Sequence, residues 1–142
     1  MPHSLDKGPI PLLEQTLEDA KQSEDWFKAV VLSAIQLERF GYRFVKEYLE
    51  NLKVEQNLIE KLLYRPAPRK IAEYLSALNS ITKEECETII RLSKWRNKFV
   101  HRTEGYKYLI GSKASKEYEP LIIESIRILR EKLNAVRIHV TP

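Results

Sequence analysis

An arginine and a histidine, Arg96 and His101, stand five positions apart near the end of a long amphipathic pattern. An arginine keeps its positive charge at physiological pH and can bind an anion such as phosphate through two parallel hydrogen bonds. A histidine has an ordinary pKa of about 6.5, so it can accept or return a proton near neutral pH. One group that holds an anion and one that moves a proton suit acid–base chemistry at a phosphate.

The segment 82–101 has the spacing of an amphipathic helix, and Arg96 lies on its apolar side. At about 100° per residue, that side is formed by Cys86, Ile89, Ile90, Leu92, Phe99 and Val100. Arg96 falls between Ile89 and Leu92, whereas the other basic residues keep to the polar side. Because a guanidinium is costly to bury unpaired, we expect Arg96 to face a partner, either a second subunit or a ligand.

The end of this helix is also polar and basic. Asn97 lies in the apolar arc and His101 stands at its edge, so both join Arg96 in one polar cluster. Between positions 91 and 107 there are six Lys or Arg residues and one acid, Glu104, a net charge of +5 (6 − 1). A basic patch of this kind attracts phosphate. The residues expected to bind the backbone of RNA without sequence preference are Lys94, Lys98, Arg102 and Lys107.

Length and composition indicate a single all-α domain over residues 1–142. Charged residues make up 31% and apolar residues 43%, which fits a globular protein with its own core. Only four glycines occur, and Leu, Ile, Glu and Lys are common, which favours helix over sheet. We therefore predict a bundle of about five to six helices with one long central helix.

The same composition argues against a membrane segment or a metal centre. No apolar run approaches the roughly 20 residues needed to cross a bilayer, and the first residues lack the core of a signal peptide, so we expect a cytoplasmic protein. The single cysteine, Cys86, and the scattered histidines His3, His101 and His139 lack metal-ligand spacing. We therefore predict no metal site and no cofactor.

Periodic apolar positions and capping signals predict where the helices begin and end. The predicted segments are a lead-in at 1–9, helices at about 11–22, 24–52, 54–64, 69–78 and 82–101, a loop at 102–115, a final helix from 115 or 119 to 136, and a tail at 137–142. Ser23 is the predicted N-cap of the long helix, and Pro120 the predicted start of the last one. Thr82 and Glu85 form a predicted capping box.

Three further features leave alternatives open. Gly41, in the long helix, either admits a neighbouring helix or marks a bend. Glu38 can meet a basic group such as Arg96, although we interpret it as a surface carboxylate. The loop at 102–115 is either a substrate-gripping segment or a plain connection, and its Tyr106 and Tyr108 can stack on bases.

The hexapeptide Arg96-Asn97-Lys98-Phe99-Val100-His101, late in a long helix that follows a longer apolar one, resembles the signature of the HEPN domain family. The resemblance covers roughly residues 12–136, and only the hexapeptide is specific. It implies a helical bundle that dimerises through the Arg/His helix. Many members of this family are metal-independent endoribonucleases with a composite site between two subunits, and the resemblance implies the same for this chain.

The implied chemistry uses few groups. His101 takes the proton from a ribose 2′-OH or returns one to the leaving 5′-oxygen, and Arg96 holds the scissile phosphate. Asn97 orients the histidine or donates to the phosphate. Since residues five apart on one helix point about 140° away from each other, one Arg96 and its own His101 flank a cleft, and two copies surround a phosphate. The expected products are a 2′,3′-cyclic phosphate and a 5′-OH end.

The expected partners are therefore single-stranded or loop RNA, a second copy of the chain and, in a toxin–antitoxin or antiviral defence setting, an antitoxin protein.

The chain departs from the pattern of one group in this family. HEPN toxins paired with a nucleotidyltransferase antitoxin typically carry a tyrosine two residues after the histidine, whereas this chain has Thr103. Two alternatives stay open: a non-catalytic HEPN-type module for nucleotides, RNA or proteins, and a helical adaptor in which Arg96 pairs with Glu38.

Overall fold

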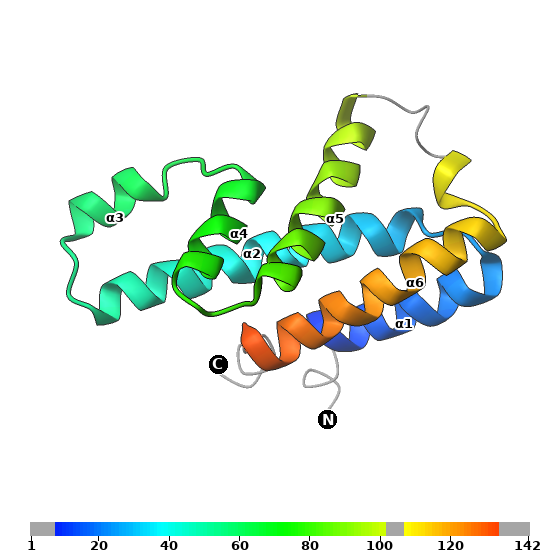
Figure 1. The fold of residues 1–142 in the computed structure, drawn as a ribbon, viewed down its shortest axis with the longest axis horizontal. Helices are drawn as coiled ribbons and strands as arrows, with labels where there is room; N and C mark the ends of the chain where they lie inside the picture. The colour runs from blue at the N-terminus through cyan, green and yellow to red at the C-terminus, as the bar shows by residue number, and fades with distance from the viewer. Residues whose placement is uncertain (1–7, 102–106, 134–142) are drawn as a thin grey trace.

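The computed structural model describes residues 8–101 and 107–133, and these residues form a helical bundle. The elements are α1 (Pro9–Ser23), α2 (Phe27–Asn51), α3 (Gln56–Leu62), α4 (Pro68–Ala77), α5 (Lys83–His101), α6 (Ser112–Arg127) and the π-helical turn η3 (Ile128–Lys132) (Figure 1). The described part contains no strand, only an isolated bridge between Asp25 and Ile110. The predicted all-α fold is confirmed.

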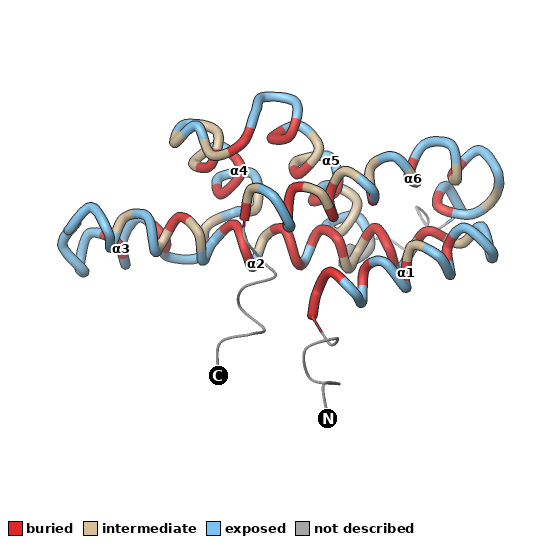
Figure 2. The backbone as a smooth tube through the Cα atoms, turned by 90° about the horizontal axis from the view of Figure 1, so that it is seen from below, coloured by how far each residue is buried: buried red, intermediate tan, exposed pale blue. Residues whose placement is uncertain are grey.

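The longest helix, α2, is the centre of the bundle. It packs against α1, α4, α5 and α6, and α1 lies beside α6 (Figure 1). Its inward positions Val30, Ala34 and Leu37 are fully buried, and burying one leucine or valine side chain contributes about 1.5–3 kcal/mol. In contrast, α3 buries only Ile59 and is otherwise exposed (Figure 2). The predicted central helix is therefore correct.

Gly41 admits a neighbouring helix, which is one of the two alternatives that the sequence left open. A Cβ added at Gly41 would lie 2.9 Å from Cγ2 of Ile71 and 3.1 Å from Cδ1 of Leu75, both on α4. These distances are shorter than ordinary van der Waals contact, so α4 packs directly against the backbone of α2 here.

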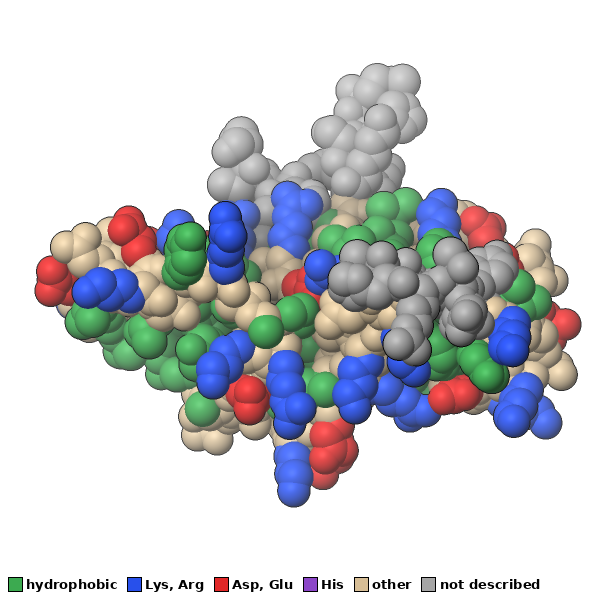
Figure 3. Space-filling view, turned by 90° about the horizontal axis from the view of Figure 1, so that it is seen from above, with side chains coloured by type: hydrophobic (Ala, Val, Ile, Leu, Met, Phe, Trp, Pro, Cys, Tyr) green, Lys and Arg blue, Asp and Glu red, His purple; other side chains and the backbone are tan. Residues whose placement is uncertain are grey.

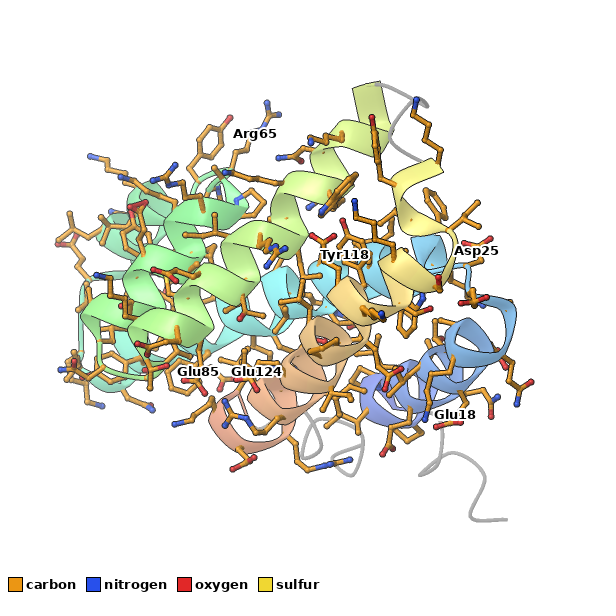
Figure 4. The ribbon with its side chains drawn as sticks, turned by 45° about the vertical axis from the view of Figure 1, so that its right-hand side comes forward. Glu18, Asp25, Arg65, Glu85, Tyr118 and Glu124 are labelled. Carbon is orange, nitrogen blue, oxygen red and sulfur yellow. The ribbon has the colours of Figure 1, made fainter. Side chains whose placement is uncertain are left out.

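The capping box at the start of α5 is confirmed. The Thr82 N–H donates to Oε1 of Glu85 at 2.7 Å, and the Glu85 N–H donates to Oγ1 of Thr82 at 3.1 Å. The buried Glu85 also pairs with Arg127, which holds Glu124 too (Figure 4). Burial would raise the pKa of Glu85, but the hydrogen bond from Thr82, the contact with Arg127 and the charge of Lys132 together hold it below 4.5. The carboxylate of Glu85 thus caps the start of α5 and also binds Arg127 at the end of α6.

Two predicted boundaries are wrong. The long helix begins at Phe27 rather than Glu24, because Glu24 adopts a left-handed conformation (φ 58°) and closes α1 with a hydrogen bond from its N–H to the Ala20 carbonyl. Asp25 then accepts a hydrogen bond from the Phe27 N–H at 3.1 Å. Ser23 lies at the end of α1 instead of capping α2.

The last helix begins at Ser112, so Pro120 lies inside it rather than at its start. The segment before it is anchored to the α1–α2 turn: the Trp26 N–H donates to the Leu109 carbonyl and the Gly111 N–H donates to the Glu24 carbonyl, both at 2.8 Å. These contacts fix Gly111 as the N-cap, so the helix begins at Ser112, eight residues before Pro120. The predicted end at Val136 lies outside the described residues.

Among residues 8–101 and 107–133, no helix has both the length and the apolar character needed to span a membrane.

Candidate functional site

Arg96 is paired within its own chain. Its Nη1 donates to Oε2 of Glu38 on α2, and the two side chains are 32% and 18% exposed. Our interpretation of Glu38 as a surface carboxylate is therefore wrong, because the carboxylate is half-buried and meets a guanidinium 58 positions away. We expected Arg96 to face a second subunit or a ligand, whereas its partner in the structure is Glu38 of the same chain.

The pair forms one wall of a surface pocket between α2, α4 and α5, called the Arg96 pocket below. Its volume is about 340 Å³. Its lining consists of Ile35, Glu38, Arg39, Tyr42, Pro66, Pro68, Ile71 and Arg96. Arg39 and several apolar side chains therefore surround the ion pair. The pocket thus combines two guanidinium groups with an apolar lining.

The carboxylate of Glu38 is poorly solvated. Its Oε1 atom is buried and has no hydrogen-bond partner. Burial raises the pKa of Glu38 above its ordinary value of 4.5, and the charge and hydrogen bond of Arg96 offset this effect only in part. Arg96 thus favours the ionised form of a poorly solvated carboxylate.

The opposite flank of α5 borders a second concave surface, which we call the Trp95 cleft. Its volume is about 500 Å³. Its lining consists of Trp95, Lys98, Lys107, Tyr108, Ile110, Lys113, Ala114, Glu117 and Tyr118. The Trp95 ring stands edge-on to the ring of buried Tyr118, with centroids 5.7 Å apart, and Tyr118 lies between α5 and α6 (Figure 4). Trp95 is therefore held by the bundle at the wall of the cleft.

Positive charge dominates the Trp95 cleft. The Nζ atoms of Lys98 and Lys107 lie 4.6 Å and 5.3 Å from the ring centroids of Trp95 and Tyr108. Among the residues that the structure describes, Glu117 is the one acid that lines the cleft, and it pairs with Arg91 at 2.5 Å, so its charge is compensated. Lys and Arg side chains are also spread over the face seen in Figure 3, with hydrophobic and some acidic side chains between them. The lining of the Trp95 cleft is suited to an anion that carries an aromatic group.

Three of the predicted site residues line these two surfaces. Arg96 lines the Arg96 pocket, whereas Lys98 and Lys107 line the Trp95 cleft. Lys94 is exposed and lines neither surface. His101 is the last residue of α5, and its side chain lies outside the part that the structure describes, as do Arg102, Thr103 and Tyr106.

Asn97 is exposed, although helical spacing puts it on the same side of α5 as the apolar arc. The arc holds for Ile89 and Leu92, which are 2% and 0% exposed. Beyond them, the last turns of α5 extend past the rest of the bundle (Figure 1), and the arc has less of the chain to pack against. Asn97 is therefore more open to solvent than its helical position implies.

Several side chains of the two surfaces were not singled out from the sequence. Trp95 carried a signal, since it is an aromatic residue between Lys94 and Arg96 in the basic run. Lys113, Tyr118 and Arg39 carried none, because only the packing of α6 and α2 against α5 brings them to these surfaces.

Other reactive groups are few within residues 8–101 and 107–133. No group of three His, Cys, Asp or Glu side chains that could hold a metal ion occurs there. Cys86 is buried, and burial together with nearby Glu73 and Glu87 raises the pKa of its thiol. A raised pKa lowers the fraction of thiolate at neutral pH, and the thiolate is the nucleophilic form of cysteine.

Comparison of the chain with protein families, with curated proteins and with solved structures finds no significant match.

Proposed function

We propose that this chain is a metal-independent endoribonuclease whose composite Arg/His site forms between two copies of the chain. The observation that supports this proposal is the placement of Arg96. Its guanidinium is neither loose in solvent nor sealed in the core, but is oriented by Glu38 at the wall of an open pocket. A guanidinium fixed in this way is ready to receive a phosphate, because Glu38 uses only part of its five N–H donors.

The proposed reaction is an internal displacement at phosphorus. His101 removes the proton from a ribose 2′-OH, the 2′-oxygen bonds to phosphorus, and the bond from phosphorus to the 5′-oxygen breaks. A histidine returns a proton to that 5′-oxygen, so the products are a 2′,3′-cyclic phosphate and a 5′-OH end. Arg96 binds the non-bridging oxygens and stabilises the charge that develops on them. In this proposal Asn97, which is exposed one position further along α5, donates to the same phosphate.

A second copy of the chain is part of the proposal. Ile35 and Tyr42, on the rim of the Arg96 pocket, are 41% and 37% exposed, which leaves apolar surface beside the ion pair. A two-fold contact there brings the same patch of both subunits together. Lys94, Lys98, Arg102 and Lys107 then supply attraction to the RNA backbone. In a cell, such a ribonuclease suits defence or a toxin–antitoxin pair, with an antitoxin protein as a further partner.

One observation favours a second candidate, a non-catalytic module that binds RNA or a nucleotide. Glu38 already neutralises Arg96 within one chain, so the arginine has a structural partner without any substrate. In that case Arg96 and Glu38 stabilise the bundle, and the basic surface alone binds RNA.

Cleavage of structured and single-stranded RNA by purified protein separates the two candidates. The proposal predicts cleavage that persists in a chelator, leaves 5′-OH ends, and disappears in Arg96→Ala and His101→Ala. Arg65→Ala and His139→Ala are controls of the same residue types, and they should cleave normally. Products with a 5′-phosphate, or activity that both test variants retain, would refute the nuclease. Binding without cleavage by folded wild-type protein would favour the second candidate.

A further inference from the structure

Two aromatic rings that line the Trp95 cleft are arranged to receive a flat group. The ring centroids of Trp95 and Tyr108 are 6.5 Å apart, and the ring planes are inclined by 50°. Two stacking distances add up to roughly 7 Å, since aromatic rings stack about 3.5 Å apart. A modest rotation of Tyr108 would therefore make room for one base between the rings.

The two walls differ in how firmly they are held. Trp95 is only partly exposed and rests edge-on against Tyr118, which is 1% exposed. Tyr108 is 61% exposed, so its ring has space to turn. A fixed platform opposite an adjustable ring is an arrangement that closes over a ligand at small cost in entropy.

The cations of the cleft complement the other half of a nucleotide. Lys98 and Lys107 each lie against one of the two rings, and Lys113 lines the cleft nearby. A base that stacks on Trp95 displaces the Lys98 ammonium from that ring, and the phosphate of the same nucleotide then becomes its partner. The base thus replaces Lys98 on the Trp95 ring, and the phosphate replaces the ring as the partner of Lys98, so the lysine keeps a partner.

We propose that the Trp95 cleft binds one unstacked nucleotide of single-stranded RNA, with the base between Trp95 and Tyr108 and the phosphate on Lys98 and Lys113. The cleft volume of about 500 Å³ falls within the roughly 300–1,000 Å³ typical of small-molecule sites. This inference rests on the proposed action on RNA and names where the strand is held, on the flank of α5 away from the Arg96 pocket. Bases in a duplex are already stacked, so the cleft selects single strands.

Tryptophan fluorescence tests this directly. The chain has two tryptophans, and Trp26 is 0% exposed with its indole N–H bonded to Ser115 at 2.8 Å. Quenching by a stacked base therefore reports on Trp95. The ligands to titrate are short oligoadenylate, the same sequence as a duplex, adenosine monophosphate and inorganic phosphate. Oligoadenylate should quench the fluorescence most strongly, the mononucleotide more weakly, and the duplex and phosphate little.

Substitutions with matched controls assign the effect to the cleft. Tyr108→Ala should raise the Kd for oligoadenylate about tenfold or more. Lys98→Gln should weaken binding and lower the slope of log K against log salt by about 0.7. Tyr64→Ala is the control, because Tyr64 is also exposed (72%) and has the guanidinium of Arg65 5.5 Å from its ring centroid, yet it lines neither the Trp95 cleft nor the Arg96 pocket. Lys61→Gln on exposed α3 is the control for charge.

The results distinguish this inference from the proposed function. Unchanged quenching in Tyr108→Ala, or equal quenching by the duplex, would overturn the nucleotide site even where Arg96→Ala abolishes cleavage. Binding that depends on Tyr108, in a protein that never cleaves RNA, would support the nucleotide site and refute the proposed nuclease activity. Stronger quenching by the mononucleotide than by oligoadenylate would overturn the assignment to an RNA strand.

Discussion

The ion pair between Glu38 and Arg96 should be energetically coupled, and a double-mutant cycle can measure the coupling. The single variants are Glu38→Gln and Arg96→Gln, and the third protein carries both substitutions. Charges about 4 Å apart attract by about 4 kcal/mol at an effective dielectric constant of about 20. Because both side chains are partly withdrawn from water, desolvation cancels much of that attraction. We expect a coupling free energy of about 1–2 kcal/mol, above the value for exposed pairs.

The same cycle has a definite pH dependence. The folded-state pKa of Glu38 lies above its ordinary value of 4.5, so protonation stabilises the fold, and this contribution is lost as pH rises through the raised value. Removing Arg96 takes away the groups that hold that pKa down. Arg96→Gln should therefore destabilise the protein more at pH 7 than at pH 4.5, and Glu38→Gln in the same chain should abolish the difference.

Urea unfolding followed by tryptophan fluorescence at both pH values gives the free energies. The pair Arg43–Glu47 on α2 is the matched control, because its nitrogen and oxygen atoms are 3.0 Å apart but its side chains are 53% and 58% exposed. Its coupling should be about 0.5 kcal/mol or less. A coupling for Glu38 and Arg96 no larger than that of the control, or one independent of pH, would refute the reasoning.

Three further predictions follow from the packing and from the site. Glu85→Gln should lower the free energy of unfolding by about 1–2 kcal/mol at pH 7, and because the pKa of Glu85 lies below 4.5, the loss should shrink as pH falls below that value in urea titrations. Gly41→Val should lower the free energy of unfolding by about 1–3 kcal/mol, seen as a reduced Tm, since even a Cβ would lie 2.9 Å from Ile71. Arg96→Lys should keep the fold but lower the cleavage rate at least tenfold in a single-turnover assay, because an ammonium cannot bind phosphate through a planar fork.

Local signals in the sequence were enough for most of the fold. The stripe of α2 and the capping box of Thr82 and Glu85 depend on residues three or four positions apart, and both occur as expected. The start of α6 could not be found in this way. It depends on hydrogen bonds from Trp26 and Gly111 that join the turn after α1 to a segment more than 80 positions away.

The candidate site divides in the same manner. The position of Arg96 on the inner flank of α5 could be predicted from helical spacing alone. Its partner Glu38 could not be selected, because many carboxylates lie beside the stripe of α2 and only the packing angle of α5 brings this one to the guanidinium. The Trp95 cleft needs three elements at once, and no pattern along the chain joins Trp95 to Lys113 and Tyr118.

The shared site is the central claim, and mixing two inactive variants tests it most directly. Arg96→Ala and His101→Ala, each without ribonuclease activity alone, are unfolded together, refolded as a mixture and assayed on the same RNA. The mixture should regain cleavage, because a mixed dimer places one intact Arg96 and one intact His101 from different chains around the phosphate. A mixture that stays as inactive as its two components, from a wild type that cleaves, would contradict a site built by two subunits.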